Sequence, residues 1–431
     1  MKILVVGSGG REHTLCWMLN QSKQVDKIYC APGNAGITQI AECVHINIGN
    51  HNYFFELVDL VMKEKIDLTV VGPEIPLAEG IIDYFKKLGL TAFGPTKEAA
   101  LIEGSKVFAK EFMKRHNIPT PEFAIFDDSK EAIEYVRLKC APIVVKADGL
   151  AAGKGVFVCS TVDEAIEAIK RTMEDKVFGN AGNKIVIDEF VVGQEASILA
   201  FSDGKIAIPM VSSQDHKQIF DGDKGSNTGG MGAYSPASII TKEMMEEIQS
   251  KILTPTIQGL VNEGREYVGV IYMGLIITED GPKVLEYNCR FGDPETQVVL
   301  PRLKTDLITI IEACIEGKLA NMNIEWDNRA TLCVVLASCG YPGNYKKGVE
   351  IFGFEEAQRL EDILIFHAGT TQKDDKILTS GGRVLGVTAY GDDIKQAKEK
   401  AYLACSKINF DGIYYRKDIG YRAISALSLI I

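Results

Sequence analysis

The chain has 431 residues, 46% of them hydrophobic, and this length predicts two to four folded domains with substantial cores. Its 47 Lys and Arg against 58 Asp and Glu give a net charge of −11, which argues against nonspecific binding to nucleic acid or anionic membranes. No stretch approaches the roughly 18 to 20 apolar residues of a membrane span, and the N-terminal apolar run is too short for a signal peptide, so we expect a cytoplasmic protein acting on small molecules.

The first hundred residues alternate short β-rich runs with helical segments. Helices are predicted over residues 12–21 and 53–65. The β-rich runs end in Gly or Pro: KILVVG (2–7), KIYCAP (27–32), LTVVGP (68–73) and LTAFGP (90–95). This alternation predicts a parallel sheet built from βαβ units.

Three further stretches follow along the chain. A helix is predicted over residues 101–116, ended by NIPTPEF, after which a new unit begins. Residues 143–278 are rich in β-runs and glycine loops. A last β-rich stretch starts near residue 330 and carries a helix over 394–406. The ten cysteines lack C-x-x-C spacing, so we expect most to be small buried hydrophobes.

Glycine turns follow successive N-terminal strands. In VVGSGGREH (5–13) they leave backbone N–H groups free to meet an anion. A dinucleotide fingerprint would need a glycine where Glu12 stands. A nicotinamide loop, a tight turn without a ligand and a phosphate or small-substrate loop all stay open. With PGNAG (32–36) and VGPEIPLAEG (71–80), the turns should gather at the carboxyl edge of one sheet, where such sheets bind ligands.

A second glycine loop lies in VVKADGLAAGKGV (144–156). Lys146 follows a β-branched run, and the loop from Gly149 to Gly155 carries Lys154, a composition suited to polyphosphate oxygens. The spacing is not that of a Walker loop, and a glycine hairpin with a solvated lysine would read similarly. In KIVIDEFVVGQEAS (184–197), residues 189–192 can offer backbone groups to a flat base. Glu195 can accept ribose hydroxyls, although an exposed strand edge would look alike.

Charged residues are concentrated in LEYNCRFGDPETQ (285–297), which follows a predicted hairpin turning at residues 279–281. The period of two in a strand places Glu286 and Asn288 on one face. Magnesium takes hard oxygen donors and only one or two carboxylates besides substrate phosphates, so this pair is a candidate metal site. Arg290 can neutralise a phosphate or a substrate carboxylate.

The same stretch has a structural interpretation. Asp293 and Glu295 could instead cap a helix that begins with Pro294 at its first position. Both interpretations can hold within one segment.

Together these motifs resemble the phosphoribosylamine–glycine ligase (glycinamide ribonucleotide synthetase) family of the ATP-grasp superfamily. The resemblance spans nearly the whole chain: GSGGREH, GPE-PL--G, EGSK-FAK-FM, VVKADGLAAGKGV, QDHK, DGDKGSNTGGMGAYSP, EYN-RFGDPETQ and SGGRVLGVTA. Ser226 departs from the family's usual proline, and Asp188 from a frequent glutamate. Thr278 and Glu279 leave open a further metal ligand that other ATP-grasp enzymes place on the first hairpin strand.

The resemblance implies a multidomain α/β and α+β fold. Its parts are an N-terminal parallel-sheet domain (1–102), an ATP-grasp domain (103–324) with a lid at about 120–187, and a β-rich C-terminal domain (325–431).

It also implies the site residues. Glu286 and Asn288 would bind Mg²⁺ or Mn²⁺, and Arg290 and Lys146 would act in catalysis. ATP would contact Lys106, Lys146, Gly153, Lys154, Gly155, Glu189, Phe190, Val192 and Glu195. The other substrates would contact Gly9, Gly10, Arg11, Glu12, Asp215, His216, Lys217, Asn227, Thr228, Gly229, Gly230, Arg290 and Asp293.

The implied reaction is a ligation in purine biosynthesis. ATP would phosphorylate glycine to glycyl phosphate, and the amine of 5-phosphoribosylamine would displace phosphate, leaving ADP as coproduct. A lid would keep water from the acyl phosphate, and no covalent enzyme nucleophile is needed. His216 is equally compatible with a purely structural role. Another ATP-grasp carboxylate–amine ligase and a non-catalytic nucleotide-binding protein remain alternatives; the oligomeric state stays open, and a monomer is compatible with the sequence.

Overall fold

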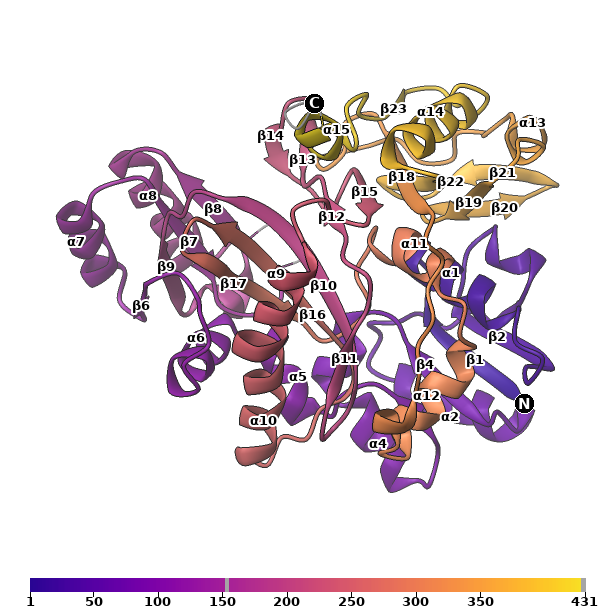
Figure 1. Cartoon of the computed structure of the whole chain (residues 1–431), viewed down its shortest axis with the longest axis horizontal. Helices are drawn as coiled ribbons and strands as arrows, with labels where there is room; N and C mark the ends of the chain where they lie inside the picture. Colours follow the sequence, from indigo (N-terminus) through magenta and orange to yellow (C-terminus); the bar gives the residue numbers. More distant parts are fainter. Residues whose placement is uncertain (152–154, 428–431) are drawn as a thin grey trace.

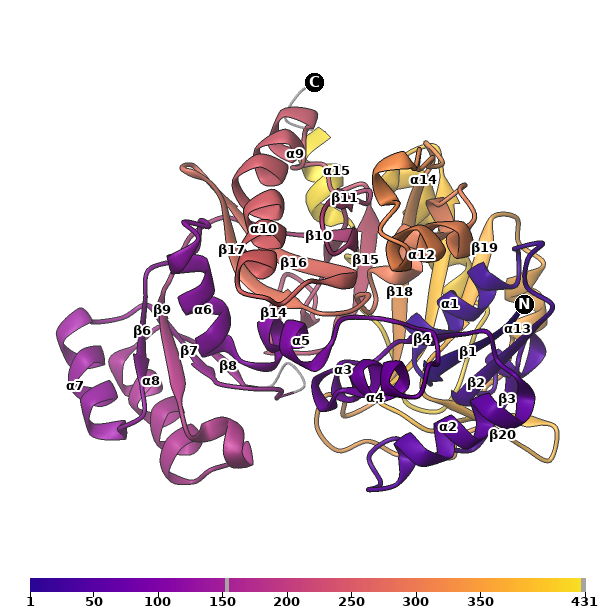
Figure 2. The same ribbon diagram turned by 90° about the horizontal axis from the view of Figure 1, so that it is seen from below.

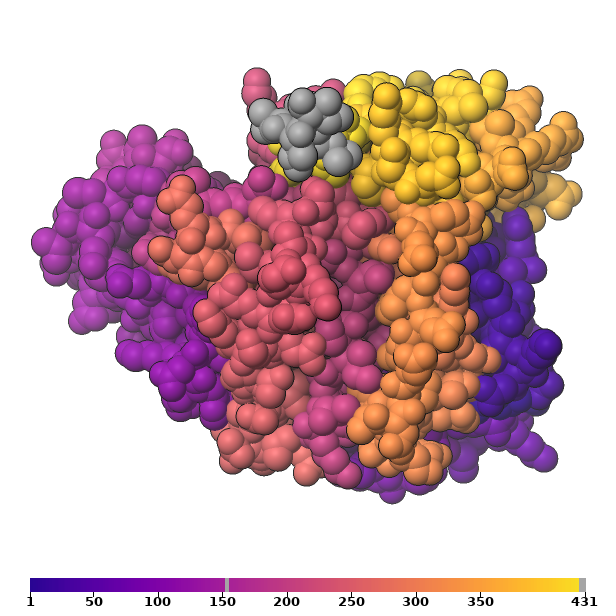
Figure 3. Space-filling model, in the orientation of Figure 1, coloured from indigo at the N-terminus to yellow at the C-terminus, as the bar shows by residue number. Residues whose placement is uncertain are grey.

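The computed structural model describes residues 1–151 and 155–427. Its chain forms an N-terminal parallel sheet, a central antiparallel sheet, a small sheet that projects from it, and a C-terminal antiparallel sheet (Figure 1). The small sheet and the N-terminal sheet lie at opposite ends of the molecule, as the space-filling view also shows (Figure 3). The predicted mixed α/β fold is confirmed: an N-terminal parallel sheet, a core made of the central and small sheets, and a β-rich C-terminal region.

The N-terminal sheet has the strand order β3-β2-β1-β4-β5, and all its pairs are parallel, as predicted. Alternate residues of β1 pack on opposite faces, with Leu4 and Val6 in one core and Ile3 and Val5 in another. The elements are β1 Lys2–Gly7, α1 Gly10–Leu19, β2 Lys27–Pro32, β3 Glu42–Cys43, α2 Tyr53–Glu64, β4 Leu68–Val71, α3 Glu74–Glu79, α4 Ile81–Lys87 and β5 Ala92–Phe93.

The helix predicted over 101–116 was wrong: the chain forms two helices, α5 Lys97–Gly104 and α6 Lys106–Arg115. Ser105 separates them in an extended conformation, and its Oγ accepts a hydrogen bond from the amide of Phe108 at 3.0 Å. Serine favours the position before a helix because its hydroxyl satisfies a free N–H of the first turn. The break directs the start of α6 toward the small sheet (Figure 2).

The central sheet has the order β11-β10-β16-β17. The predicted hairpin is confirmed: β16 and β17 pair antiparallel and turn at residues 279–280. Helices α5, α9 and α10 contribute to the core on one face of the sheet, and α12 to the core on the other. The elements are β10 Gln194–Asp203, β11 Ala207–Pro209, α9 Lys242–Ile248, α10 Thr254–Asn262, β16 Val268–Thr278, β17 Gly281–Asn288 and α12 Leu307–Ile315.

The small sheet, here called the lid, has the order β6-β9-β7-β8 and a hydrophobic core of its own. This separate core is what allows the lid to project from the central sheet (Figure 1). Its elements are β6 Phe123–Phe126, α7 Ser129–Lys139, β7 Ile143–Ala147, β8 Val156–Cys159, α8 Val162–Ile169 and β9 Ile185–Glu189.

The C-terminal sheet contains two strands from the middle of the sequence. β12 and β15 join β18, β22 and β19, so residues 214–235 pack with the C-terminal third of the chain. The elements are β12 Gln214–Asp215, β13 Gln218–Phe220, β14 Lys224–Asn227, β15 Gly232–Ser235, α11 Thr296–Val299, β18 Ala330–Ser338, α13 Phe354–Gln358, β19 Ile363–His367, β20 Thr370–Lys373, β21 Lys376–Thr379, β22 Arg383–Gly391, α14 Ile394–Cys405, β23 Ile413–Tyr414 and α15 Tyr421–Leu427.

All ten cysteines are free thiols, and most of them are buried, as predicted. No helix within residues 1–151 and 155–427 combines the length and apolar character needed to cross a membrane.

Candidate active site

A cavity of about 360 Å³ lies where the four sheets meet. The predicted residues that line it are Arg11, Lys106, Lys146, Gly155, Asp215, Lys217, Thr228, Gly229, Glu286, Asn288, Arg290 and Asp293. Five other charged residues line the cavity, and no ligand was predicted for them: Glu74, Glu103, Lys110, Glu295 and Arg383.

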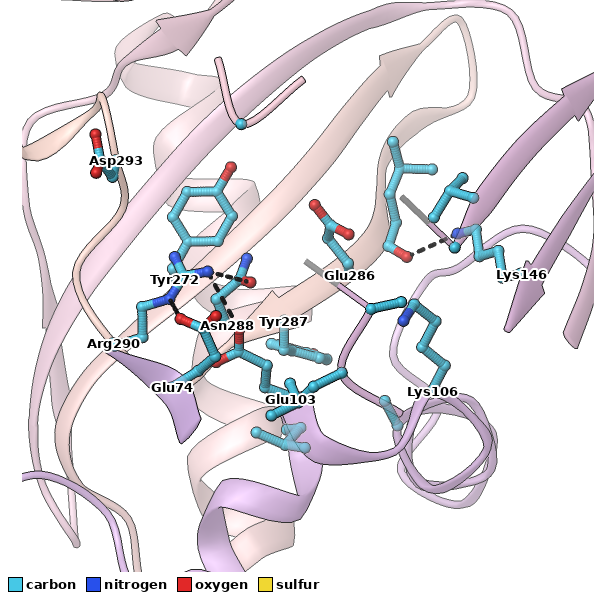
Figure 4. Close-up of a pocket in the computed structure, with 18 of the residues that line it drawn as sticks. Glu74, Glu103, Lys106, Lys146, Tyr272, Glu286, Tyr287, Asn288, Arg290 and Asp293 are labelled. Atoms are coloured by element: carbon cyan, nitrogen blue, oxygen red, sulfur yellow. Dashed lines mark hydrogen bonds and ion pairs between the residues drawn. The ribbon is translucent and has the colours of Figure 1, made fainter. Parts of the chain in front are cut away.

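The candidate metal ligands project from β17 into this cavity. Asn288 pairs with Tyr272 of β16 and Glu286 with Gly274, and a register shift beside Gly274 leaves Leu285 without a partner in the ladder. Figure 4 shows Glu286 between the two labelled lysines and Arg290. The expected common face for Glu286 and Asn288 is thus observed, and β16 offers no carboxylate opposite either of them.

Burial alone would raise the pKa of Glu286, but Lys217, Lys146 and Lys106 outweigh it, so its pKa is lowered. The carboxylate is therefore ionised at neutral pH and available to a cation.

Two lysines share one buried carboxylate at the lid side of the cavity. Asp188 Oδ2 lies 2.8 Å from Lys146 Nζ and 2.9 Å from Lys110 Nζ. Lys146 also donates to the carbonyl of Leu285 at 3.1 Å, and Lys110 to Thr120 Oγ1 at 2.8 Å. Burial lowers the pKa of Lys110 to about 8, although Asp188 opposes this shift. Lys110 lies one helical turn after Lys106, a spacing that could have identified it.

Lys106 begins α6 beside the glycine loop. Its Nζ donates to the carbonyl of Gly149 at 3.0 Å, and burial lowers its pKa. Asp148 Oδ1 accepts from Ser105 Oγ at 3.0 Å and from the amide of Val107 at 3.1 Å. The helix start is thereby fixed to the loop that follows β7.

The Arg290 guanidinium is surrounded by polar partners at the other side of the cavity (Figure 4). Its Nε is 3.1 Å from Glu74 Oε2, and its Nη2 is 3.3 Å from Glu103 Oε1 and 3.2 Å from Asn288 Oδ1. Glu103 Oε2 accepts from the amide of Cys289 at 2.6 Å. Burial would raise the pKa of Glu74, but Arg290 and Arg11 lower it to about 2. Glu74 and Glu103 belong to the motifs GPE-PL--G and EGSK-FAK-FM, but no role was predicted for either residue.

The first glycine loop is shaped around Glu12. Glu12 Oε2 accepts from the amide of Gly9 at 2.5 Å, and Oε1 lies 2.6 Å from Arg11 Nε. A Cβ at Gly7 or Gly72 would lie within 2.6 or 2.0 Å of the Glu12 side chain, so both glycines make room for it. An internal carboxylate thus occupies the place where a dinucleotide loop carries its third glycine.

The N-terminal turns gather at one sheet edge, as predicted: Gly33 N donates to Gly7 O and Gly72 N to Val6 O, each at 3.0 Å. A second cavity of about 330 Å³ adjoins this edge. It is lined by Ser8, Gly9, Gly33, Asn34, Asp293, Ala368, Gly369, Thr370, Ser380, Gly381 and Arg383.

Asp293 and Arg383 line both cavities. Arg383 Nη1 donates to the Asp293 carbonyl at 2.8 Å, and its Nη2 lies 3.3 Å from Asp293 Oδ2. The predicted cap was wrong: the helix begins at Thr296, and neither Asp293 nor Glu295 caps it through its side chain. The Glu295 carboxylate instead accepts from Ser197 and Tyr272.

Several predicted substrate residues lie outside the cavity lining. His216 is fully buried and accepts from the amide of Gly420 at 3.0 Å, and burial lowers its pKa to about 4. Asn227 pairs with Gln218 in the β13–β14 hairpin. Gly10 packs against Gln297, and Gly230 against Pro294.

The predicted adenine and ribose contacts also lie outside the lining of the described cavity. Glu189 accepts from the amide of Glu122 at 3.0 Å, and Phe190 and Val192 are exposed. Glu195 Oε2 lies 2.9 Å from Lys217 Nζ. Gly153 and Lys154 fall outside the residues that the structure describes.

An antiparallel central sheet and a separate lid that hold lysines, a Glu/Asn pair and an arginine around one cavity define the chain as an ATP-grasp protein. Family models match three parts of it: Phosphoribosylglycinamide synthetase N domain (1–103), ATP-grasp (A) domain (104–296) and C domain (331–422). The chain belongs to the phosphoribosylglycinamide synthetase family.

Proteins that are similar to this chain over nearly its whole length share one name. A phosphoribosylamine–glycine ligase of Caldanaerobacter subterraneus is 52% identical over 97% of this chain and 99% of its own, and one of Halalkalibacterium halodurans is 49% identical over 99% and 98%. The crystal structure of a phosphoribosylamine–glycine ligase from Thermotoga maritima matches with a TM-score of 0.82 and 34% identity, covering 97% of this chain and 100% of that one. A biotin carboxylase domain from Hydrogenobacter thermophilus, 16% identical with a TM-score of 0.75 over 96% and 91%, shares the fold.

Proposed function

We propose that this chain joins glycine to 5-phosphoribosylamine, giving glycinamide ribonucleotide, ADP and phosphate in purine biosynthesis. The observation that carries this function is the identity of about half of all residues to ligases of that name, over nearly the full length of both chains. The chain is an ATP-grasp carbon–nitrogen ligase, and this class uses ATP with a divalent metal ion.

The lysine side of the cavity is our proposed ATP site. Lys106 and Lys146 would pair with phosphate oxygens, and the loop from Gly149 to Gly155 would cover them. Glu189, Phe190 and Val192 would meet adenine and Glu195 the ribose once the lid (about 120–187) closes over the nucleotide. In the division of the chain into 1–102, 103–324 and 325–431, this lid belongs to the middle domain.

Glu286 and Asn288 fit a divalent ion chemically. They offer one ionised carboxylate and one amide oxygen on a common face, the hard donors that Mg²⁺ or Mn²⁺ accepts together with substrate phosphates. A bound ion supplies positive charge to the transferred phosphoryl group.

The reaction needs two steps at the cavity. A carboxylate oxygen of glycine attacks the γ-phosphorus of ATP, which forms glycyl phosphate and releases ADP. The amine of phosphoribosylamine then attacks the acyl carbon, so the C–O bond to phosphate breaks and an amide forms. Lys146 and Arg290 would stabilise the charge that develops on the transferred group and on the carbonyl oxygen. Lid closure would keep water from the acyl phosphate.

The second cavity is our proposed phosphoribosyl site. Backbone N–H groups of the N-terminal turns and the Arg383 guanidinium border it, and both suit a phosphorylated sugar. It meets the first cavity at Asp293 and Arg383, so an amine held there can reach the acyl group.

The test generates phosphoribosylamine in the assay from ribose 5-phosphate and ammonia, and follows ADP release while each component is omitted in turn. Formation of glycinamide ribonucleotide should require every component. Turnover with an unrelated acceptor and none with phosphoribosylamine would instead favour another ATP-grasp carboxylate–amine ligase. Nucleotide binding without turnover would favour a non-catalytic protein.

A further inference from the structure

Two buried histidines join helix α1 to the C-terminal sheet. His13 belongs to α1 and His367 ends β19, and the two residues are 8% and 3% exposed. The backbone N–H of His367 donates to His13 Nδ1 at 2.8 Å, and the two ring centroids lie 5.6 Å apart. α1 and β19 lie side by side in both ribbon views (Figures 1 and 2). The reaction steps proposed above use neither ring.

The hydrogen bond defines the ionisation state of His13. A ring nitrogen that accepts a hydrogen bond carries a lone pair, so the proton of His13 is on Nε2 and the ring is neutral. Burial lowers the pKa of His13 to about 3 and that of His367 to about 4, so both rings stay neutral at pH 7. Nδ1 of His13 is therefore an acceptor for the His367 N–H throughout the neutral pH range.

The backbone of His367 is held on both sides by the N-terminal part of the chain. Its N–H is bonded to His13, and its carbonyl accepts from Asn34 Nδ2 at 2.8 Å. Asn34 Nδ2 also donates to the carbonyl of Ser8 at 2.8 Å. His367 Nδ1 lies 3.1 Å from Thr370 Oγ1. The three residues that follow His367 line the second cavity, so these bonds fix one wall of that cavity against the N-terminal turns.

The turn after β2 leaves room for the two rings. A Cβ at Gly36 would lie 2.5 Å from His13 Cε1 and 2.5 Å from His367 Cδ2, so the imidazoles occupy the space that a side chain at this position would need. Gly36 ends the PGNAG turn, which contributes Gly33 and Asn34 to the second cavity. The start of α1, the turn after β2 and the end of β19 therefore meet at one hydrogen bond.

We propose that His13 is a positioning residue for the phosphoribosyl acceptor, because its Nδ1 holds residues 367–370 at the spacing from the N-terminal turns that the second cavity requires. This inference rests on the proposed function, in which that cavity receives phosphoribosylamine. His13 does not line either described cavity, so it acts through the backbone of His367 and not by touching the substrate. Its loss should weaken binding of the acceptor, since a preformed wall is part of the binding energy.

The test replaces the ring while keeping or removing the acceptor. H13L has a similar volume and no acceptor, so the buried His367 N–H loses its partner. The apparent KM for phosphoribosylamine should rise roughly 10- to 100-fold in H13L, whereas the KM values for glycine and ATP should stay within about twofold of wild type. Steady-state kinetics with each substrate varied in turn measures this. An equal rise in all three KM values would indicate a merely structural role and would overturn the proposal.

Two amide variants separate the acceptor from the fold. The side-chain oxygen of H13N takes the place of Nδ1, so H13N should restore most of the affinity for phosphoribosylamine that H13L loses. H13Q places its oxygen one bond farther out, near the position of Nε2, and should resemble H13L. H45L, which alters an exposed histidine of the same N-terminal region, should behave as wild type. Equal kinetics of H13N and H13Q would refute the role of Nδ1 even if H13L did not fold.

The same measurements distinguish this inference from the proposed function. If wild type makes no glycinamide ribonucleotide, the proposed function fails and this inference fails with it. Normal wild-type turnover together with an unaltered KM for phosphoribosylamine in H13L would overturn this inference alone.

Discussion

The two sides of the first cavity differ in how their cations are balanced. Lys110 and Lys146 share the single carboxylate of Asp188, and Lys106 donates to a neutral carbonyl. Arg290, by contrast, lies between two carboxylates, those of Glu74 and Glu103.

The lysine side is therefore suited to binding a negatively charged ligand, whereas the arginine side holds its guanidinium in a fixed position. On the lysine side, three ammonium groups have one directly paired carboxylate between them, so this side gains most when a polyphosphate arrives. The arginine side is already neutralised, and its partners fix the guanidinium before any ligand is present. Changes at the lysine side should therefore affect ATP, and changes at the arginine side should affect the stability of the fold as well.

The largest effect is expected from K146M, which keeps the apolar stem and removes the charge. We expect kcat/KM for ATP to fall by roughly 10²- to 10³-fold, as when one preorganised donor is lost. Steady-state kinetics and calorimetry with ATP measure this. K251M, which alters an exposed lysine on the surface, serves as the control. ATP affinity equal to wild type in K146M would remove Lys146 from the nucleotide site.

E286Q should have the next largest effect. It removes the ionised carboxylate from the candidate metal pair with little change in volume, so the Mg²⁺ concentration needed for half-maximal activity should rise roughly 10- to 100-fold. The fold should persist by circular dichroism. E243Q, at an exposed position of α9, is the matched control. Near-normal activity of E286Q at limiting Mg²⁺ would defeat the assignment.

E74Q tests the arginine side through stability. The lowered pKa of Glu74, about 2 against a usual 4.5, means that its charge stabilises the fold above pH 4.5, and that this contribution is lost as pH falls toward 2. At pH 7 the free energy of unfolding should drop by roughly 2–3 kcal/mol in urea titrations. E98Q breaks an exposed pair with Arg265 and should cost about 0–1 kcal/mol. Equal losses in both variants would contradict the preassembled network.

The smallest effect is expected from a rise in pH, which should weaken the binding of ATP. Because the pKa of Lys110 is lowered to about 8, its charge is lost as pH rises through 8, and the lysine side becomes less positive. ATP affinity should then fall several-fold between about pH 7 and 9 by calorimetry, an order-of-magnitude expectation from one charge near a polyphosphate. K110M should lack this step, and its persistence there would assign the titration to another group.

The features that could be predicted from the sequence are those set by residues close together in the chain. The period of two placed Glu286 and Asn288 on one face, and the βα alternation predicted the parallel sheet, because both follow from local patterns. Ser105 was missed as a helix break, although Gly-Ser before a lysine-rich helix is a local signal.

Long-range pairing explains what the sequence did not reveal. Glu74 and Arg290 lie 216 positions apart in the chain, and no local pattern joins them. Residues 214–235 join a sheet formed mainly by the C-terminal third, which places Asp215 and Lys217 in the cavity and keeps His216 in the core. Such contacts depend on packing between sheets rather than on spacing in the sequence.

The most direct test of the acyl-phosphate reaction follows an oxygen atom. Glycine labelled with oxygen-18 in its carboxylate is converted in the complete reaction, and the released inorganic phosphate is analysed by mass spectrometry. The account predicts one labelled oxygen in each phosphate, because a glycine oxygen bonds to the γ-phosphorus and leaves with it when the amide forms. Unlabelled phosphate, or label in AMP with pyrophosphate as coproduct, would contradict it.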